Sequence, residues 1–158
     1  GFGLEAGEVL GRELELAGGE RVRIHTVAVG NPHCVVFVDE LRREDFVRQA
    51  PQLGAHPAFR AGTNVQFARV AGPGTLEAWI YERGAGETLA SGSSASAVAA
   101  AAVRLGLVEA GELVVRMPGG SVGVEVREDY RIRLRGPAQI VYRGAVRAAV
   151  VEGWGRLE

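Results

Sequence analysis

The sequence predicts an α+β fold in which a mostly antiparallel, curled sheet surrounds one central alanine-rich helix. Apolar and polar residues alternate over most of the chain, which is typical of strands that expose one face to water. Glycine accounts for 23 of the 158 residues, about twice its usual share, and favours tight turns between such strands. The run 94–103 has no polar face wider than a serine, so it predicts a helix buried on all sides.

The first half of the chain consists of short alternating runs separated by turn residues, and one polar, helix-like run. The polar run follows Asp39 and Glu40, acids that the helix dipole favours at a helix start. The expected elements are a hairpin of 12–16 with 21–29, a loop at 30–33, a strand buried on both faces at 34–38, and a helix at 41–50.

The second half continues the alternation around the buried helix, which Gly106 is expected to end in the C′ position. Gly72-Pro73-Gly74 is a strong turn signal between two strands. The expected elements are strands at 63–70 and 75–81, a glycine-rich loop at 82–91, the helix at 93–105, strands at 112–117, 121–126 and 130–134, and a last pair around 139–142 and 146–152.

Composition excludes several classes of function. The net charge is −1, from 18 basic and 19 acidic residues without a basic block, so no electrostatic feature favours a nucleic acid or a membrane surface as partner. All the basic residues are arginine, which excludes chemistry that needs a lysine Schiff base.

The single cysteine, Cys34, cannot form an internal disulfide. Together with the lack of a recognisable signal peptide, it favours a cytoplasmic location. The most apolar run, 95–103, is far shorter than the about 20 residues that a membrane helix needs. We therefore expect no membrane span.

The segment 82–94 is the first candidate site, because it leads directly into the alanine-rich helix. Free amides at a helix start, approached closely through glycines, suit a carboxylate or phosphate. The alternative is that Ser91 or Ser93 only caps the helix, and the sequence leaves both interpretations open. No phosphate-binding Gly-Lys pair and no dinucleotide fingerprint is present.

The segment 30–34 is the second candidate, with His33 and Cys34 after an Asn-Pro turn. Adjacent residues do not easily reach one ion and no second cluster is evident, so we expect no metal site. Free cysteine is usually buried, which predicts that Cys34 lies in the core. His33 is expected on the loop, where a structural hydrogen bond is the alternative to a functional role.

Three motifs in order give the chain a specific resemblance. Gly30-Asn31-Pro32-His33-Cys34, Thr63-Asn64-Val65-Gln66-Phe67 and Glu82-Arg83-Gly84-Ala85-Gly86-Glu87-Thr88 resemble the C-terminal domain of the diaminopimelate epimerase family over nearly the whole of 1–158. The resemblance implies a single lobe here, whose N-terminal partner lobe is absent, with the active site between two similar lobes. It also implies an amino-acid substrate and no cofactor.

The resemblance assigns substrate-binding roles to six positions. Asn31, Asn64, Glu82 and Arg83 would bind the distal amino-acid end of the substrate, and the amides of Gly92 and Ser93 would hold the α-carboxylate.

The catalytic positions depart from the family pattern. The family exchanges the α-proton between two cysteines, and Ser91 stands where the second is expected, with His33 beside the reacting centre. A further family cysteine is replaced by Ser96, and the first catalytic cysteine, on the missing lobe, has no counterpart. A serine hydroxyl without a partner is too weak a base for this step.

Three hypotheses remain open. The chain is one lobe of an epimerase that converts LL- to meso-diaminopimelate and is inactive alone; or it is a one-base isomerase or dehydratase similar to proline racemases or phenazine-biosynthesis enzymes; or it is a binding module without catalysis. Asn31, Asn64 and the Glu82-Arg83 pair favour a diaminopimelate-like ligand. Removal of a covering lobe would expose apolar surface around 90–95 and favour self-association, a homodimer included.

Overall fold

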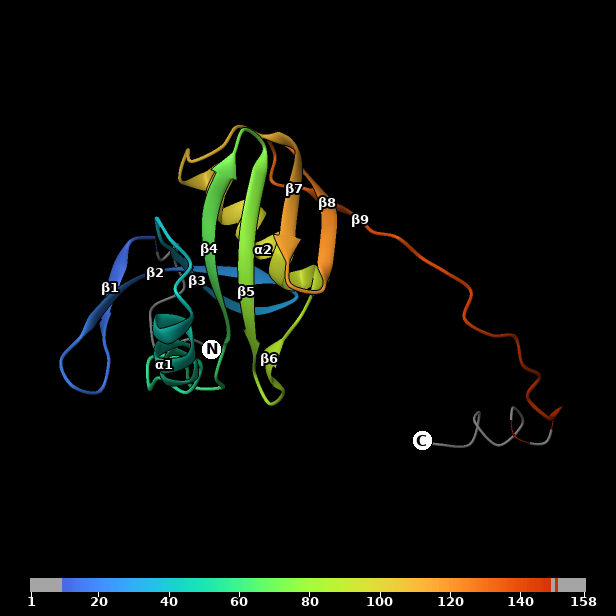
Figure 1. The fold of residues 1–158 in the computed structure, drawn as a ribbon, viewed down its shortest axis with the longest axis horizontal. Helices are drawn as coiled ribbons and strands as arrows, with labels where there is room; N and C mark the ends of the chain where they lie inside the picture. Colours follow the sequence, from blue (N-terminus) through green and yellow to red (C-terminus); the bar gives the residue numbers. More distant parts are fainter. Residues whose placement is uncertain (1–9, 149, 151–158) are drawn as a thin grey trace.

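Within residues 10–148 and 150, which the computed structural model describes, nine strands form one mixed sheet and two helices, α1 and α2, pack against it (Figure 1). The strands are β1 Arg12–Glu15, β2 Arg21–Val29, β3 Asn31–Phe37, β4 Asn64–Gly72, β5 Thr75–Glu82, β6 Gly86–Thr88, β7 Gly111–Met117, β8 Gly120–Val126 and β9 Ile132–Arg135. The helices are α1 Arg43–Gly54 and α2 Gly92–Arg104.

The sheet is mostly antiparallel, as predicted, but contains two parallel pairs that the sequence did not indicate. The strand order is β1-β2-β3-β4-β5-β7-β8-β9, with β6 paired to β5. The pairs β3–β4 and β5–β7 are parallel. A parallel pair needs a long crossover, and α1 and α2 supply the two crossovers.

Helix α2 lies inside the curl of the sheet (Figure 1), where it contacts β2 to β5 and β7 to β9. Its residues 94–102 are all buried, which confirms the prediction of a central helix. Gly106 ends the helix with a φ of +68°, a backbone conformation that glycine adopts at no steric cost.

Two apolar cores lie on opposite faces of the sheet. The inner core joins α2 to residues such as Val35, and the outer core lies under α1 and contains Cys34 and Val36. Because successive side chains of a strand point to opposite faces, the continuous apolar run of β3 serves both cores. On the outer face, Phe46 of α1 packs edge-on against Phe67, with ring centroids 5.6 Å apart.

The segment 30–33 is not a loop, contrary to the prediction. Gly30 alone reverses the chain, with a φ of +72°, and Asn31 already pairs with Val29 across the two strands. A glycine in the left-handed region makes this turn in one residue. As a result, Asn31 and His33 are held on a strand.

The boundaries of α1 also differ from the prediction. Arg42 occupies the N-cap position, and the acids of the first turn are Glu44 and Asp45 rather than Asp39 and Glu40. The helix runs past Ala50 to Gly54, because Pro51 is accommodated within it.

The last predicted strand pair is not formed in the described residues. Segment 136–147 has no regular structure, and Figure 1 shows it leaving the sheet after β9. Ile140, Val141 and Tyr142 are exposed by 76%, 90% and 84%. Nothing in the described chain pairs with 139–142, and residues 151–152 lie outside the described residues.

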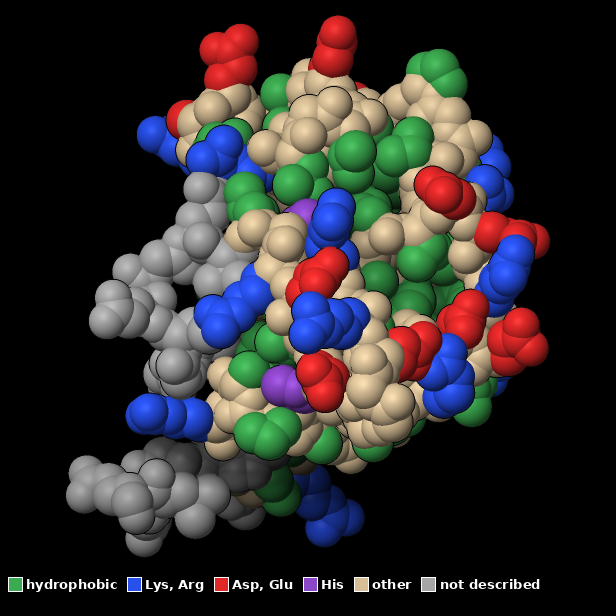
Figure 2. Space-filling model, turned by 90° about the vertical axis from the view of Figure 1, so that its left-hand side faces the viewer, with side chains coloured by type: hydrophobic (Ala, Val, Ile, Leu, Met, Phe, Trp, Pro, Cys, Tyr) green, Lys and Arg blue, Asp and Glu red, His purple; other side chains and the backbone are tan. Residues whose placement is uncertain are grey.

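Two surface features bear on the kind of partner expected from the sequence. No helix in the described part of the chain has the length and apolar character to cross a membrane. On the side of the molecule that Figure 2 shows, arginine and acidic side chains are interspersed rather than gathered by sign. This face offers no basic patch for a nucleic acid.

Candidate functional site

A chain of hydrogen-bonded polar side chains runs along the inner face of the sheet at one end of α2. Gln66 Nε2 lies 3.0 Å from Ser94 Oγ and 3.0 Å from His33 Nδ1. His33 Nε2 lies 2.9 Å from Asn31 Oδ1. Since His33, Gln66 and Ser94 are completely buried, these contacts replace the hydrogen bonds that water would otherwise make.

His33 occupies the middle of this chain as a neutral ring. Burial lowers the pKa of His33 to about 4, against the opposing effects of the Gln66 hydrogen bond and the Glu82 charge. Both ring nitrogens have partners, so the predicted structural hydrogen bond is present twice. At neutral pH the ring carries no charge.

Asn64 lies next to His33 in the parallel register of β3 and β4. Its Oδ1 accepts a hydrogen bond of 2.9 Å from the backbone amide of Arg83. The Arg83 guanidinium donates to the carbonyl oxygen of Ala61 at 2.8 Å, and Glu82 ends β5 beside it, half-buried. The fold therefore brings the polar residues of all three motifs together.

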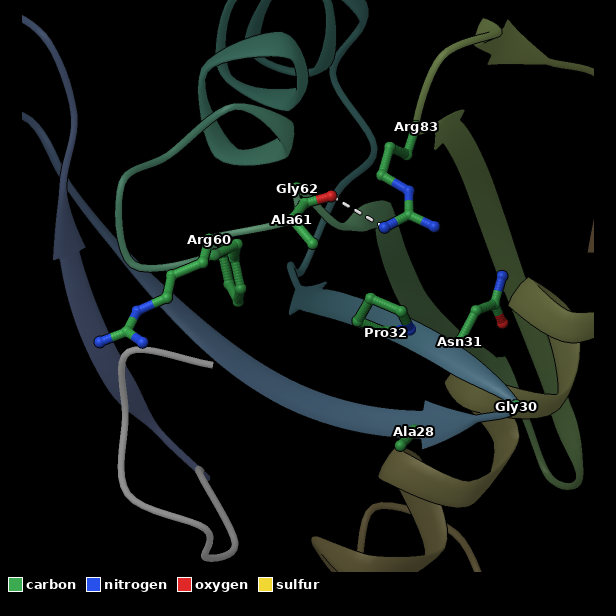
Figure 3. Close-up of a pocket in the computed structure, with 9 residues that line it drawn as sticks. Ala28, Gly30, Asn31, Pro32, Arg60, Ala61, Gly62 and Arg83 are labelled. Carbon is green, nitrogen blue, oxygen red and sulfur yellow. Dashed lines mark hydrogen bonds between the residues drawn. The ribbon is translucent and has the colours of Figure 1, made fainter. Parts of the chain in front are cut away.

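A pocket of about 320 Å³ opens beside these residues, and Figure 3 shows several of those that line it, among them Asn31, Pro32 and Arg83. Gly62 forms part of its wall with a φ of +69°. A Cβ at this position would lie 3.1 Å from Arg83 Cδ, so the glycine lets the arginine approach closely. A guanidinium and an amide at one pocket suit a carboxylate.

The start of α2 is the second candidate site for an anion. Ser91 is the N-cap residue, but its side chain makes no capping hydrogen bond, and its Oγ lies 3.4 Å from Ser93 Oγ. Ser96 Oγ donates instead to the Gly92 carbonyl oxygen at 2.9 Å. Because the Ser91 side chain does not cap the first turn, this geometry favours the anion-site interpretation over simple capping by Ser91.

Gly92 lies where α2 approaches β9. A Cβ on Gly92 would lie 2.6 Å from Leu134 Cδ2 of β9. The start of α2 therefore packs closely against the last strand of the sheet.

The remaining candidates lie apart from this site. Cys34 is buried in the outer core, as predicted, and burial raises the pKa of its thiol well above the usual range. His25 accepts a hydrogen bond from the Gly11 amide at 3.1 Å, and His56 contacts the Glu15 carbonyl at 3.2 Å. Residues 10–148 and 150 contain no group of three potential metal ligands.

Two residues of the site, Gln66 and Ser94, were not singled out from the sequence. Gln66 occupies an inner-face position of β4, between Asn64 and Ala68. A polar residue at a position that strand alternation assigns to the core is the signal that could have found it. The buried Ser94 follows the same logic in α2.

Solved structures with a similar fold come from the phenazine biosynthesis protein PhzF family. The protein from Bacillus anthracis is 18% identical, with a TM-score of 0.52 over 72% of this chain and 38% of that one. The protein from Enterococcus faecalis is 16% identical, with a TM-score of 0.51 over 66% and 39%. At these identities the likeness shows the fold alone.

Sequence comparison is more specific. The family model of diaminopimelate epimerase matches residues 25–141. Diaminopimelate epimerases of Desulfitobacterium hafniense and Pelotomaculum thermopropionicum are each 40% identical, over 90% and 87% of this chain. The chain spans about half the length of these relatives, 50% and 49%. On this match over most of its length, the chain belongs to the diaminopimelate epimerase family.

Proposed function

We propose that this chain is the C-terminal lobe of a cytoplasmic, cofactor-independent epimerase that interconverts LL- and meso-diaminopimelate, and that the lobe is inactive by itself. One observation carries the proposal. The uncapped start of α2 and the pocket beside Arg83 are two features that suit carboxylates, and the hydrogen-bonded chain from Ser94 to Asn31 joins them. Diaminopimelate carries an amino-acid group at each end, so it needs two such features.

Inactivity of the lobe follows from its acid–base groups. Inversion at the α-carbon needs a base on each face of the carbon. Ser91 occupies the position of one family thiol, and the partner of its hydroxyl is another serine, Ser93. His33, which the resemblance places beside the reacting centre, has hydrogen-bond partners on both ring nitrogens and a pKa that burial lowers to about 4. Neither residue can take the α-proton efficiently.

A one-base isomerase or dehydratase is the second candidate. Ser91 is the observation that favours it, because an active site with a competent base on only one face can still remove a proton without inverting the centre. In that case the missing lobe supplies the only base.

The test combines binding with isotope exchange. The 158-residue chain is titrated with meso-diaminopimelate and, as a control, with lysine, which lacks the second carboxylate. We expect weak, saturable binding of diaminopimelate only, no interconversion, and no deuterium exchange in D₂O. Interconversion by this chain would contradict the inactivity of the lobe, and an absence of binding would contradict the substrate.

Two arginines provide a matched pair of variants. Arg83 and Arg60 both line the pocket. The Arg83 guanidinium bonds to the Ala61 carbonyl, whereas Figure 3 shows the Arg60 guanidinium directed away from both Asn31 and Arg83. Arg83→Ala should weaken diaminopimelate binding by about 10-fold or more, in line with a lost charge-assisted hydrogen bond. Arg60→Ala should leave binding nearly unchanged, and equal losses in both variants would refute the placement of the distal site.

A further inference from the structure

We propose that Gln66 is a positioning residue: its carboxamide holds His33 as the Nε2–H tautomer, and His33 in turn holds Asn31 with its amide nitrogen facing the pocket. This proposal rests on the proposed function in one respect only, that the ligand bound at the pocket is a carboxylate. The hydrogen-bond directions themselves can be tested without any ligand.

The directions follow from the two contacts of Gln66 Nε2. An amide nitrogen has two hydrogens and donates both, here to His33 Nδ1 and to Ser94 Oγ, each at 3.0 Å. An Nδ1 atom that accepts a hydrogen bond carries no proton, so the neutral ring carries its proton on Nε2. That Nε2–H is the donor to Asn31 Oδ1 at 2.9 Å.

The orientation of the Asn31 amide determines which of its atoms is free to contact a ligand. Because Asn31 Oδ1 accepts from His33, the Asn31 amide nitrogen remains to donate elsewhere. Figure 3 shows this nitrogen on the side of the Asn31 amide that is nearer to Arg83, with the oxygen on the opposite side. An amide donor and a guanidinium on one side of a pocket are complementary to a carboxylate. The reversed amide would present an oxygen and repel it.

Gln66 is poorly explained as a residue that only fills space. It is completely buried, and its Oε1 has no hydrogen-bond partner. A buried oxygen without a partner lowers stability, and an apolar side chain of similar size would avoid that loss. The role of Gln66 therefore lies in the two hydrogen bonds that its amide nitrogen donates.

The surroundings of His33 keep the ring neutral. Gln66 of β4 and Ser94 of α2, which contact it through the chain, are uncharged. Glu82 at the end of β5 is the acid whose charge acts on the ring, and Arg83 follows it. On β2, His25 lies near Val35 of the same inner face and has its own partner, the Gly11 amide. Burial outweighs the Glu82 charge and holds the pKa of His33 at about 4.

The experiment is nitrogen-15 NMR of the imidazole rings in the 158-residue chain. Three histidines give three resolved ring systems, and His25 and His56 serve as internal references. We expect His33 to be the Nε2–H tautomer from pH 6 to 8 in the unaltered chain. An Nδ1–H tautomer there would overturn the proposal. This measurement needs no variant, so it stands even if substitutions at the buried position do not fold.

Variants then test whether Gln66 is the cause. Gln66→Glu replaces the donor by a carboxylate, which favours a proton on Nδ1 and should move the titration midpoint of His33 upward by about 1–3 pH units. Gln66→Met removes the donor and should give a mixture of tautomers. Gln52→Glu makes the same change of charge on α1, on the opposite face of the sheet, and should leave His33 unchanged. A folded Gln66→Glu chain whose His33 titrates as before would overturn the proposal.

Ligand binding separates this inference from the proposed function. In Gln66→Met, affinity for meso-diaminopimelate should fall several-fold while the two reference histidines keep their chemical shifts. If the unaltered chain does not bind diaminopimelate at all, the proposed substrate fails but the tautomer result still decides the role of Gln66. If Gln66→Met mixes the tautomers without loss of affinity, the link from His33 to the pocket is wrong.

Discussion

Replacing Gly62 by alanine should destabilise the chain and disturb the pocket at the same time. The residue has a φ of +69°, a left-handed conformation that costs an L-residue with a Cβ about 1–2 kcal/mol. The new Cβ would also lie 3.1 Å from Arg83 Cδ and 3.2 Å from the Gly54 carbonyl oxygen. The side chain can move, but the backbone oxygen can do so only with α1.

Gly106→Ala provides the matched control. Gly106 has nearly the same φ, +68°, and a Cβ there would have no neighbour within 4 Å. In the control variant, the backbone conformation alone lowers the free energy of unfolding, by about 1–2 kcal/mol. Crowding of the kind expected at Gly62 adds about 1–3 kcal/mol. Since each kcal/mol lowers the Tm of a chain of this size by about 2–4 °C, Gly62→Ala should melt several degrees below Gly106→Ala.

Thermal unfolding followed by circular dichroism measures the first effect, and titration with meso-diaminopimelate measures the second. Displacement of Arg83 should break its bond to the Ala61 carbonyl and weaken binding in Gly62→Ala alone. If the two variants lose the same stability and bind equally, the close approach of Gly62 to Arg83 has no energetic consequence and our account of the pocket wall is wrong.

Four further outcomes are expected. In a complete two-lobe protein that keeps a first-lobe cysteine, Ser91→Cys should raise the rate of racemisation by about 10²–10⁴-fold, because the helix start lowers the pKa of a thiol. If the variant binds diaminopimelate but its racemisation rate does not rise, position 91 is not catalytic. Burial lowers the pKa of His33 from 6.5 to about 4, so between these pH values only the unfolded chain binds a proton at this residue. The free energy of unfolding should therefore fall by about 3 kcal/mol when the pH is lowered from 6.5 to 4. In denaturant titrations, His33→Gln should make the free energy of unfolding less dependent on pH in this range. Cys34 is fully buried with a raised pKa and should react with a thiol reagent only after unfolding; rapid labelling of the native chain would contradict its place in the core. Leu89 is 64% exposed next to the exposed Ala90, so light scattering should show self-association that increases with concentration. The apolar patch is smaller than the expected 90–95, because Ala95 is buried. A monodisperse monomer at high concentration would count against self-association.

Local patterns predicted most of the elements because strands and helices differ in their period. The hairpin of β1 and β2 and the helix α2 lie within a few residues of their expected positions. The parallel pairs β3–β4 and β5–β7 were missed, since a strand's alternation shows which face is buried and not which strand is its neighbour. The segment 139–142 has the pattern of a strand but no partner in the described chain, and a strand pattern alone does not supply one.

Most residues of the candidate site were singled out through the motifs, whereas their arrangement in space could not be predicted. Asn31 and Asn64 were singled out by resemblance, but a loop at 30–33 would have left Asn31 free to move. The one-residue turn at Gly30 depends on a positive φ, which the sequence permits without requiring. Gln66 was overlooked because the strand that contains it was interpreted as a regular alternation.

The position of the site follows from how the inner face of the sheet changes along its length. Toward one end, the inner positions of β3 and β4 are apolar, with Val35 and Ala68 in the core against α2. Toward the other end, the same positions become His33 and Gln66, and the facing residue of α2 is Ser94. Buried polar groups are more stable where they bond to one another, and the start of a helix leaves amides that need partners. The polar end of the sheet therefore coincides with the uncapped start of α2, and a carboxylate bound there would supply what that end of the helix lacks.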